Sequence, residues 1–302
     1  MENEELIERI KRLKKKKNAV ILAHTYQRPE IYEVADFIGD SYGLSKKATE
    51  TDADIIVFCG VDFMAESAYI LNPDKTVLIP TSLANCPMAA MVDVDGLREL
   101  KKKHPNAAVV SYVNTSAELK AESDICCTSS NAVKVVNSLE EDEVIFVPDS
   151  NLANYVMRHT DKKIIPWNGW CYVHRKFSPE GLSRAINMYV NAKVLVHPEC
   201  VIEVIDLADE VCSTTGMINY VRQSSDKMFI IATEVGMIER LRLEFPDKIF
   251  FQAPPGGICI QMKKINLGLV LDALETEQFK ITVPEDIRVR AKKALDRMLD
   301  VD

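Results

Sequence analysis

Three cysteines at regular intervals are the residues of this chain best placed to do chemistry. Cys86, Cys171 and Cys259 follow, by 68, 65 and 68 residues, an asparagine that opens a short apolar run. Cysteine thiolates bind zinc ions and iron–sulfur clusters. Three protein ligands leave one coordination position open, which distinguishes catalytic metal sites from structural ones. If the cysteines converge, the pattern predicts either a 4Fe-4S cluster whose free iron acts as a Lewis acid or a zinc ion with His174 as fourth ligand.

The three asparagines also open similar segments that end in polar pairs. The pairs are His24 and Tyr26, Tyr112 and Asn114, and His197 and Glu199. Each pair follows an apolar run that predicts a buried strand, and residues two apart on an extended chain point to the same side. Ligands of open parallel sheets bind outside the carboxyl ends of the strands. Because all six side chains can donate, accept or transfer protons, we interpret them as one shared site.

A hydroxyl recurs 23 residues after each asparagine, at Ser41, Ser129 and Thr214. Each hydroxyl lies where a strand is expected to give way to a helix. Serine and threonine are good helix N-caps, which is one explanation of the pattern. Helix N-termini also bind carboxylates and phosphates. We favour an anion-binding role, with three helix ends facing a small, negatively charged substrate.

The remaining cysteines give weaker signals. Those at positions 59, 126, 127 and 212 fall at the ends of predicted strands, where small apolar residues pack well. Cys200 lies beside the proposed site, and its role stays open. The sequence has no C-x-x-C pair and hence no local zinc-ribbon signal.

A repeat of 85 to 88 residues is the length of a small domain, so three lobes are expected to position these side chains. Apolar runs alternate with helical patterns in each repeat, which predicts parallel βαβ units. The expected fold class is α/β, with three similar three-layer αβα lobes arranged about a pseudo-threefold axis. The predicted domains are residues 1–85, 86–170 and 171–302, the last with a C-terminal helical extension. Beyond Cys259 the pattern predicts a helix over 266–277, a strand over 279–283 and a helix over 284–299.

Composition narrows the class of protein. The chain has 302 residues, 47% of them apolar, and a formal net charge of −8. An acidic balance argues against nucleic-acid binding, which needs a basic face. No apolar run reaches the roughly 20 residues of a membrane span, and the start does not resemble a signal peptide. We therefore expect a cytoplasmic protein whose eight cysteines stay reduced.

The sequence resembles the quinolinate synthase family, the iron–sulfur enzymes of de novo NAD biosynthesis. The resemblance runs nearly end to end. Its specific motifs are Leu22-Ala-His24-Thr-Tyr26-Gln27, Ile38-Gly-Asp-Ser41, Gly60-Val-Asp-Phe-Met-Ala-Glu66, Cys86-Pro-Met88, Tyr112-Val-Asn114, Thr128-Ser-Ser-Asn131, Cys171-Tyr-Val-His174, His197-Pro-Glu-Cys200 and Ser213-Thr214. Thr25, Trp170 and Gln261 depart from residues common in the family. A C-x-x-C pair near the third cysteine, present in some relatives, is absent here.

The resemblance implies a 4Fe-4S cluster held by one cysteine of each lobe, at Cys86, Cys171 and Cys259. The implied reaction condenses iminoaspartate with dihydroxyacetone phosphate to give quinolinate, phosphate and water. It also implies coupling to an aspartate oxidase or dehydrogenase that supplies the imine.

Within that reaction, the candidate residues take separate roles. Tyr26, His197 and Glu199 are the candidates for proton transfer. The substrate-binding candidates are His24, Ser41, Tyr112, Asn114, Ser129, His174 and Thr214.

Three alternatives remain open from the sequence. Two are other trilobal enzymes with three cluster cysteines, a hydroxymethylbutenyl diphosphate reductase and a radical enzyme of the diphthamide type. The third is a three-domain binding protein without catalysis. The two histidine-containing pairs argue against mere binding, because binding rarely needs so many proton-transfer groups.

Overall fold

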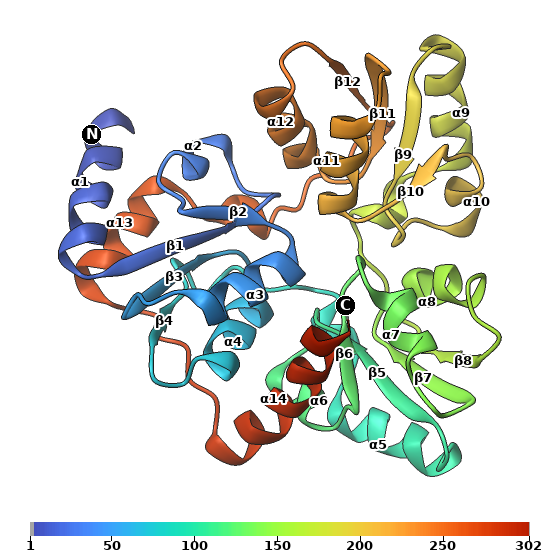
Figure 1. Ribbon diagram of the computed structural model, residues 1–302, viewed down its shortest axis with the longest axis horizontal. Coiled ribbons are helices and arrows are strands. Elements are labelled where there is room, and N and C mark those ends of the chain that lie inside the picture. Colours follow the sequence, from blue (N-terminus) through green and yellow to red (C-terminus); the bar gives the residue numbers. More distant parts are fainter. Residues whose placement is uncertain (1–2, 302) are drawn as a thin grey trace.

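Three small sheets organise the molecule. The computed structural model describes residues 3–301, which form three four-stranded, all-parallel sheets. Their strand orders are β2-β1-β3-β4, β6-β5-β7-β8 and β10-β9-β11-β12, so one topology occurs three times. The lobes built on these sheets surround a common centre (Figure 1). The predicted α/β class with three similar αβα lobes is confirmed.

The first lobe begins with a helix and then alternates strands with helices. Its elements are α1 (Asn3–Lys16), β1 (Ala19–His24), α2 (Pro29–Tyr32), β2 (Phe37–Gly39), α3 (Ser41–Glu50), β3 (Ile55–Cys59), α4 (Asp62–Leu71) and β4 (Thr76–Leu78). All five residues of β3 are buried, as are the last four of β1. Their apolar sequences suit strands that are covered on both faces.

The second lobe repeats this plan. Its elements are η1 (Ala89–Met91), a 3₁₀ helix, followed by α5 (Val94–Lys103), β5 (Ala108–Tyr112), α6 (Ala117–Ala121), β6 (Ile125–Cys127), α7 (Ala132–Asn137), β7 (Glu143–Val147), α8 (Ser150–Met157) and β8 (Lys163–Pro166).

The third lobe also begins with a 3₁₀ helix. Its elements are η2 (His174–Lys176), α9 (Pro179–Met188), β9 (Lys193–Val196), α10 (Ile202–Ile205), β10 (Glu210–Val211), α11 (Thr214–Gln223), β11 (Met228–Ala232), α12 (Val235–Glu244), β12 (Ile249–Gln252) and η3 (Met262–Lys264).

The C-terminal helices leave the third lobe and return to the other two (Figure 1). Helix α13 (Leu267–Thr276) packs on α1 and β3, and α14 (Glu285–Asp300) packs on α6, β6 and α4. The C-terminal extension therefore covers the first and second sheets. The boundaries at 85/86 and 170/171 stay a prediction.

The strand predicted over residues 279–283 is wrong. Only Lys280 forms a bridge, antiparallel to Leu78. Phe279 has a φ of 56°, in the left-handed region, and this interrupts the extended conformation that a strand requires. Two backbone hydrogen bonds hold the segment beside β4: the Ile79 N–H donates to the Phe279 carbonyl, and the Ile281 N–H donates to the Val77 carbonyl.

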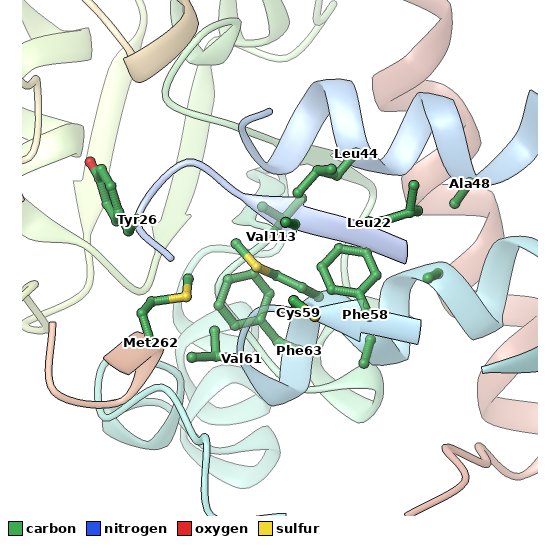
Figure 2. Packing of buried hydrophobic residues seen from close by; sticks show 14 of the residues in the cluster. Leu22, Tyr26, Leu44, Ala48, Phe58, Cys59, Val61, Phe63, Val113 and Met262 are labelled. Atoms are coloured by element: carbon green, nitrogen blue, oxygen red, sulfur yellow. The ribbon is translucent and has the colours of Figure 1, made fainter. Parts of the chain in front are cut away.

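The largest hydrophobic cluster is shared by all three lobes. Figure 2 shows Phe58 and Phe63 of the first lobe in the same cluster as Val113 of the second and Met262 of the third. Burial of such side chains is the main favourable term in folding. The lobes are thus joined by a common core, which keeps their inner ends at fixed positions. Among residues 3–301, no helix combines the length and the apolar character needed to cross a bilayer.

Candidate active site

A central cavity receives side chains from all three lobes. It lies where the first strands and the three cysteine loops meet. All thirteen residues singled out from the sequence line it: His24, Tyr26, Ser41, Cys86, Tyr112, Asn114, Ser129, Cys171, His174, His197, Glu199, Thr214 and Cys259. The structure therefore brings the candidates together, and their individual roles stay predictions.

The polar pairs reach the cavity from the carboxyl ends of the first strands. His24 and Tyr112 are the last residues of β1 and β5, and His197 directly follows β9. Their side chains are almost completely buried. The second members of the pairs follow two residues later and line the same cavity.

The three cysteines have the same local structure in each lobe. Cys86, Cys171 and Cys259 each lie three residues before a 3₁₀ helix, η1, η2 and η3 respectively. Each sulfur accepts a backbone N–H from the first residue of that helix: Ala89, His174 and Met262. The sulfur of Cys86 interacts electrostatically with those of the other two cysteines. Burial raises the pKa of all three thiols.

A continuous chain of hydrogen bonds crosses the site beside Cys171. The Tyr26 hydroxyl lies 2.6 Å from Thr233 Oγ1, which lies 2.8 Å from His174 Nε2. His174 Nδ1 lies 2.9 Å from Glu199 Oε2. The Tyr112 hydroxyl donates to Glu199 Oε1. All five side chains are buried. We call this chain, from Tyr26 to Tyr112, the relay; it connects proton donors and acceptors that come from all three lobes.

Burial and charge set the protonation of the acidic groups in this relay. Burial acts to raise the pKa of Glu199, but the neighbouring His174 and its hydrogen bond outweigh it and hold the pKa well below its usual range. Glu199 is therefore an ionised carboxylate at neutral pH. Burial raises the pKa of Tyr26 and of Tyr112 well above that of a free phenol, so both tyrosines keep their protons.

Two histidines of the cavity are held in the neutral form. Burial lowers the pKa of His24 to about 3, and Lys263 adds to this effect. Burial also lowers the pKa of His197 to about 3, aided by His174. The His174 and His197 rings stack with centroids 4.2 Å apart. The Nδ1 of His24 accepts the Tyr26 N–H at 3.0 Å, and the Nδ1 of His197 accepts the Glu199 N–H at 3.4 Å. In a neutral ring the proton is then on Nε2, so both residues can donate a hydrogen bond to a substrate.

Ser41 and Thr214 do not cap the helices that they begin. Asp40 caps α3 by accepting the Gly43 N–H at 2.8 Å, and Ser213 caps α11 by accepting the Gly216 N–H at 3.2 Å. The hydroxyls of Ser41 and Thr214 line the cavity instead.

The third hydroxyl is placed differently. Ser129 precedes the short helix α7 by three residues and hydrogen-bonds Tyr112. The three equivalent hydroxyls thus share the cavity but not their local structure.

The geometry gives little support to a zinc ion with His174 as its fourth ligand. Within residues 3–301, one ligand atom each of Cys171, His174 and Glu199 lies within 4.8 Å of the others, so this group could hold a metal ion. Both ring nitrogens of His174, however, are engaged, one by Glu199 and one by Thr233. A ligating histidine needs one nitrogen for the metal. His174 is better placed as a member of the relay than as a fourth ligand.

The remaining cysteines are packing residues or lie apart from the cavity. Cys59, Cys126 and Cys127 are buried in strands. Cys200 is buried beside Glu199, where its thiol lies 3.6 Å from the Ala232 carbonyl oxygen. Cys212 is half-buried in the third lobe.

Thr233 is the member of the relay that the sequence analysis did not identify. It follows β11, and the corresponding residues after β3 and β7 are Gly60 and Pro148. Comparison of the repeats therefore gives no signal for a hydroxyl at this position. A search for polar residues at the carboxyl ends of all the buried strands would have included it.

Comparisons with known proteins agree with the motifs in this site. A family model described as quinolinate synthetase A protein matches residues 8–300. A protein named quinolinate synthase from Methanosarcina barkeri is 57% identical, over 100% of this chain and 99% of its own length. Proteins of the same name from Geobacter metallireducens and Alkaliphilus metalliredigens are 54% and 52% identical. Each covers the whole of this chain, over 99% and 100% of its own length respectively.

Proposed function

This chain belongs to the quinolinate synthetase A family, and from that premise we propose that it condenses iminoaspartate with dihydroxyacetone phosphate to give quinolinate, phosphate and water. The observation that carries the proposal is the buried Glu199 carboxylate. It accepts hydrogen bonds from Tyr112 and His174 in a cavity that three cysteines also line. Such a site combines proton transfer with a place for a metal centre.

The proposed cofactor is a 4Fe-4S cluster held by Cys86, Cys171 and Cys259. The donor set fits such a cluster, because it offers three sulfurs from three directions, each supported by a backbone N–H. The bound cluster would supply an open iron as a Lewis acid that polarises substrate oxygen atoms. Since burial raises the pKa of these thiols, metal binding must displace their protons.

Anionic parts of the substrates have a suitable place between two helix N-termini. Helices α3 and α11 begin at the cavity with Ser41 and Thr214, and unpaired N–H groups at such ends attract carboxylate and phosphate oxygens. Asn114 lines the same cavity, and its Oδ1, which has no hydrogen-bond partner within residues 3–301, can accept a hydrogen bond from a substrate N–H or O–H group. We assign these three residues, with Ser129 and His24, to substrate binding.

Proton transfers are assigned to the relay. Isomerisation, imine formation and aromatising dehydration each require a base and an acid. Glu199 is ionised and can take a proton from carbon, and Tyr26 keeps its proton and can donate a hydrogen bond to an oxygen atom that is leaving. The single O–H of Tyr112 is donated to Glu199 and holds that carboxylate in place. His197 is neutral and lies beside Glu199, with Nδ1 3.9 Å from Oε1. The relay through His174 allows a proton to be returned without entry of water.

The setting of the reaction follows from the substrates. Iminoaspartate is an oxidised form of aspartate, so an aspartate oxidase or dehydrogenase must supply it. All eight cysteines of the chain are free thiols, which fits the reducing cytoplasm.

Anaerobic reconstitution with iron and sulfide, followed by an assay for quinolinate, tests the proposal. We expect a brown protein with about four irons per chain that forms quinolinate from the two substrates. The Glu199→Gln variant should keep the iron and lose turnover, whereas Glu203→Gln, an exposed glutamate four residues further on, should behave as wild type. A colourless, zinc-loaded protein would contradict the cofactor, and a brown protein without product would contradict the reaction.

A further inference from the structure

Three acidic residues form a second threefold set behind the cysteines. Asp62, Asp149 and Glu234 follow the third strand of each sheet, β3, β7 and β11, by two or three residues. Asp149 and Glu234 have no exposed surface, and Asp62 is largely covered. None of them lines the cavity, so the proposed reaction gives them no role.

Each acid accepts the backbone N–H of the next of the three cysteines along the chain. Asp62 Oδ1 lies 3.1 Å from the Cys86 nitrogen, and Asp149 Oδ2 lies 3.2 Å from the Cys171 nitrogen. Glu234 Oε1 lies 3.0 Å from the Cys259 nitrogen. The same interaction thus occurs once after each sheet, on the residue that the proposed cluster requires.

The same carboxyl groups also hold the start of the following helix. Asp62 Oδ1 accepts the Phe63 N–H at 2.9 Å. Asp149 Oδ1 accepts the N–H groups of Asn151 and Leu152 at 2.8 and 2.9 Å. Glu234 Oε2 accepts the Gly236 N–H at 2.6 Å. Each acid therefore ties an irregular loop to a helix that is packed against the sheet.

The ionic surroundings of the three acids differ. Lys263 Nζ lies 3.4 Å from Glu234 Oε2, and buried Lys120 interacts electrostatically with Asp62. Within residues 3–301, no lysine or arginine forms an ion pair with Asp149. Burial of a carboxyl group without a neighbouring cation destabilises the folded state. The Asp149 carboxyl group is therefore stabilised by the backbone N–H groups that it accepts rather than by a salt bridge.

We propose that Asp62, Asp149 and Glu234 are positioning residues that preform the socket for the metal centre by fixing the backbone of each cysteine. This inference rests on the proposed cluster for its function, but the geometry that it claims belongs to the chain alone. The socket is then threefold in two layers, with thiols facing the cavity and carboxyl groups behind them.

The three acids differ in which carboxyl oxygen accepts each N–H group, so their amide variants should behave differently. In Asp149 and Glu234, one oxygen serves the cysteine and the other serves the helix. An amide offers only one acceptor oxygen, so Asp149→Asn or Glu234→Gln must leave one set of N–H groups facing an NH₂ donor. In Asp62 a single oxygen accepts both N–H groups, so Asp62→Asn can keep both bonds.

The experiment measures the cluster and the loop separately. After anaerobic reconstitution, iron and sulfide per chain and the rate of iron loss to a chelator are compared for the variants. We expect the rate for Asp149→Asn and Glu234→Gln to rise by roughly tenfold or more, because each leaves a buried donor unpaired. Asp62→Asn should stay near wild type. Asp93→Asn, which alters an exposed N-cap of the same kind away from the cysteines, is the matched control.

Hydrogen–deuterium exchange of the cluster-free chain keeps this inference separate from the cofactor proposal. Segment 168–174 should exchange faster in Asp149→Asn than in wild type or in Asp93→Asn. Unchanged exchange together with unchanged chelator resistance would overturn the inference, as would equal losses in all three variants, which would indicate a charge effect. A wild-type chain that takes up no iron would overturn the cofactor proposal, and exchange would still decide the role of the carboxyl groups.

Discussion

The cysteine loops and the ends of the first strands line the same cavity, but the lobes repeat in the first region and diverge in the second. Each cysteine loop has the same residue, the same 3₁₀ helix and an acid behind it. The strand ends keep only their position, with His24 and Tyr26 in one lobe, Tyr112 and Asn114 in the next, and His197 and Glu199 in the third. One region is symmetric and the other is not.

The chemistry proposed for each region explains this difference. A cluster with three equivalent protein ligands is served equally well by three identical loops. A condensation between two different substrates needs an acid, a base and anion donors at different places around one centre. Repetition therefore suits the cofactor socket, whereas catalysis requires that the lobes differ.

The largest effect should come from breaking the symmetric region. Cys86→Ala, Cys171→Ala and Cys259→Ala should each abolish quinolinate formation, because a cluster bound by two thiolates is not retained. Iron content after anaerobic reconstitution should fall to a similar level in all three. Cys200→Ala, at a buried thiol outside the socket, is the control. A cysteine variant that keeps its iron would show that the three loops are not equivalent.

The next largest effect should come from the asymmetric region. Glu199→Gln should lower kcat by about 10² to 10⁴, the usual contribution of a general base. The iron content should stay at the wild-type value, because Glu199 is not one of the three thiol ligands. Single-turnover and steady-state assays of reconstituted enzyme measure this. Near-normal kcat would remove Glu199 from its assigned role.

The relay offers a smaller and more specific test. Thr233→Val keeps the shape of the side chain but removes the hydroxyl between Tyr26 and His174. We expect kcat to fall by about tenfold to a hundredfold, because one or two buried polar groups lose a partner, with little change in KM or iron content. Thr233→Ser should restore most of the rate. Equal losses for serine and valine would indicate packing rather than proton relay.

Much of this arrangement could be predicted because it repeats. The asparagine-led strands set the frame in which Ser41, Cys171 and Glu199 occupy fixed offsets, and parallel sheets bring such offsets to one edge. The parallel direction of the strands followed from the same alternation of apolar runs and helices.

Features that lack the same residue at the same offset in all three lobes were out of reach of this comparison. Thr233 has no hydroxyl counterpart in the other lobes. Among the acids behind the cysteines, Asp149 and Glu234 share one offset from their asparagines but differ in type, and Asp62 lies one residue further on. The docking of α13 and α14 on the first and second sheets depends on tertiary packing, which their amphipathic patterns do not specify.

The smallest expected effect is visible only in acid and shows how the asymmetric region is held together. Burial lowers the pKa of His197 to about 3 in the folded chain, whereas an unfolded histidine has a pKa of about 6.5. Between these values the unfolded chain binds a proton that the folded chain does not, so the stability that His197 provides is complete above about pH 6.5 and declines as the pH falls. At about pH 5 the loss should reach about 2 kcal/mol. The free energy of unfolding of the cluster-free chain, measured in urea at about pH 7.5 and pH 5, should therefore fall more for wild type than for His197→Gln. Parallel losses in the two proteins would mean that the imidazole takes up a proton within the fold, and that burial does not keep this part of the site neutral.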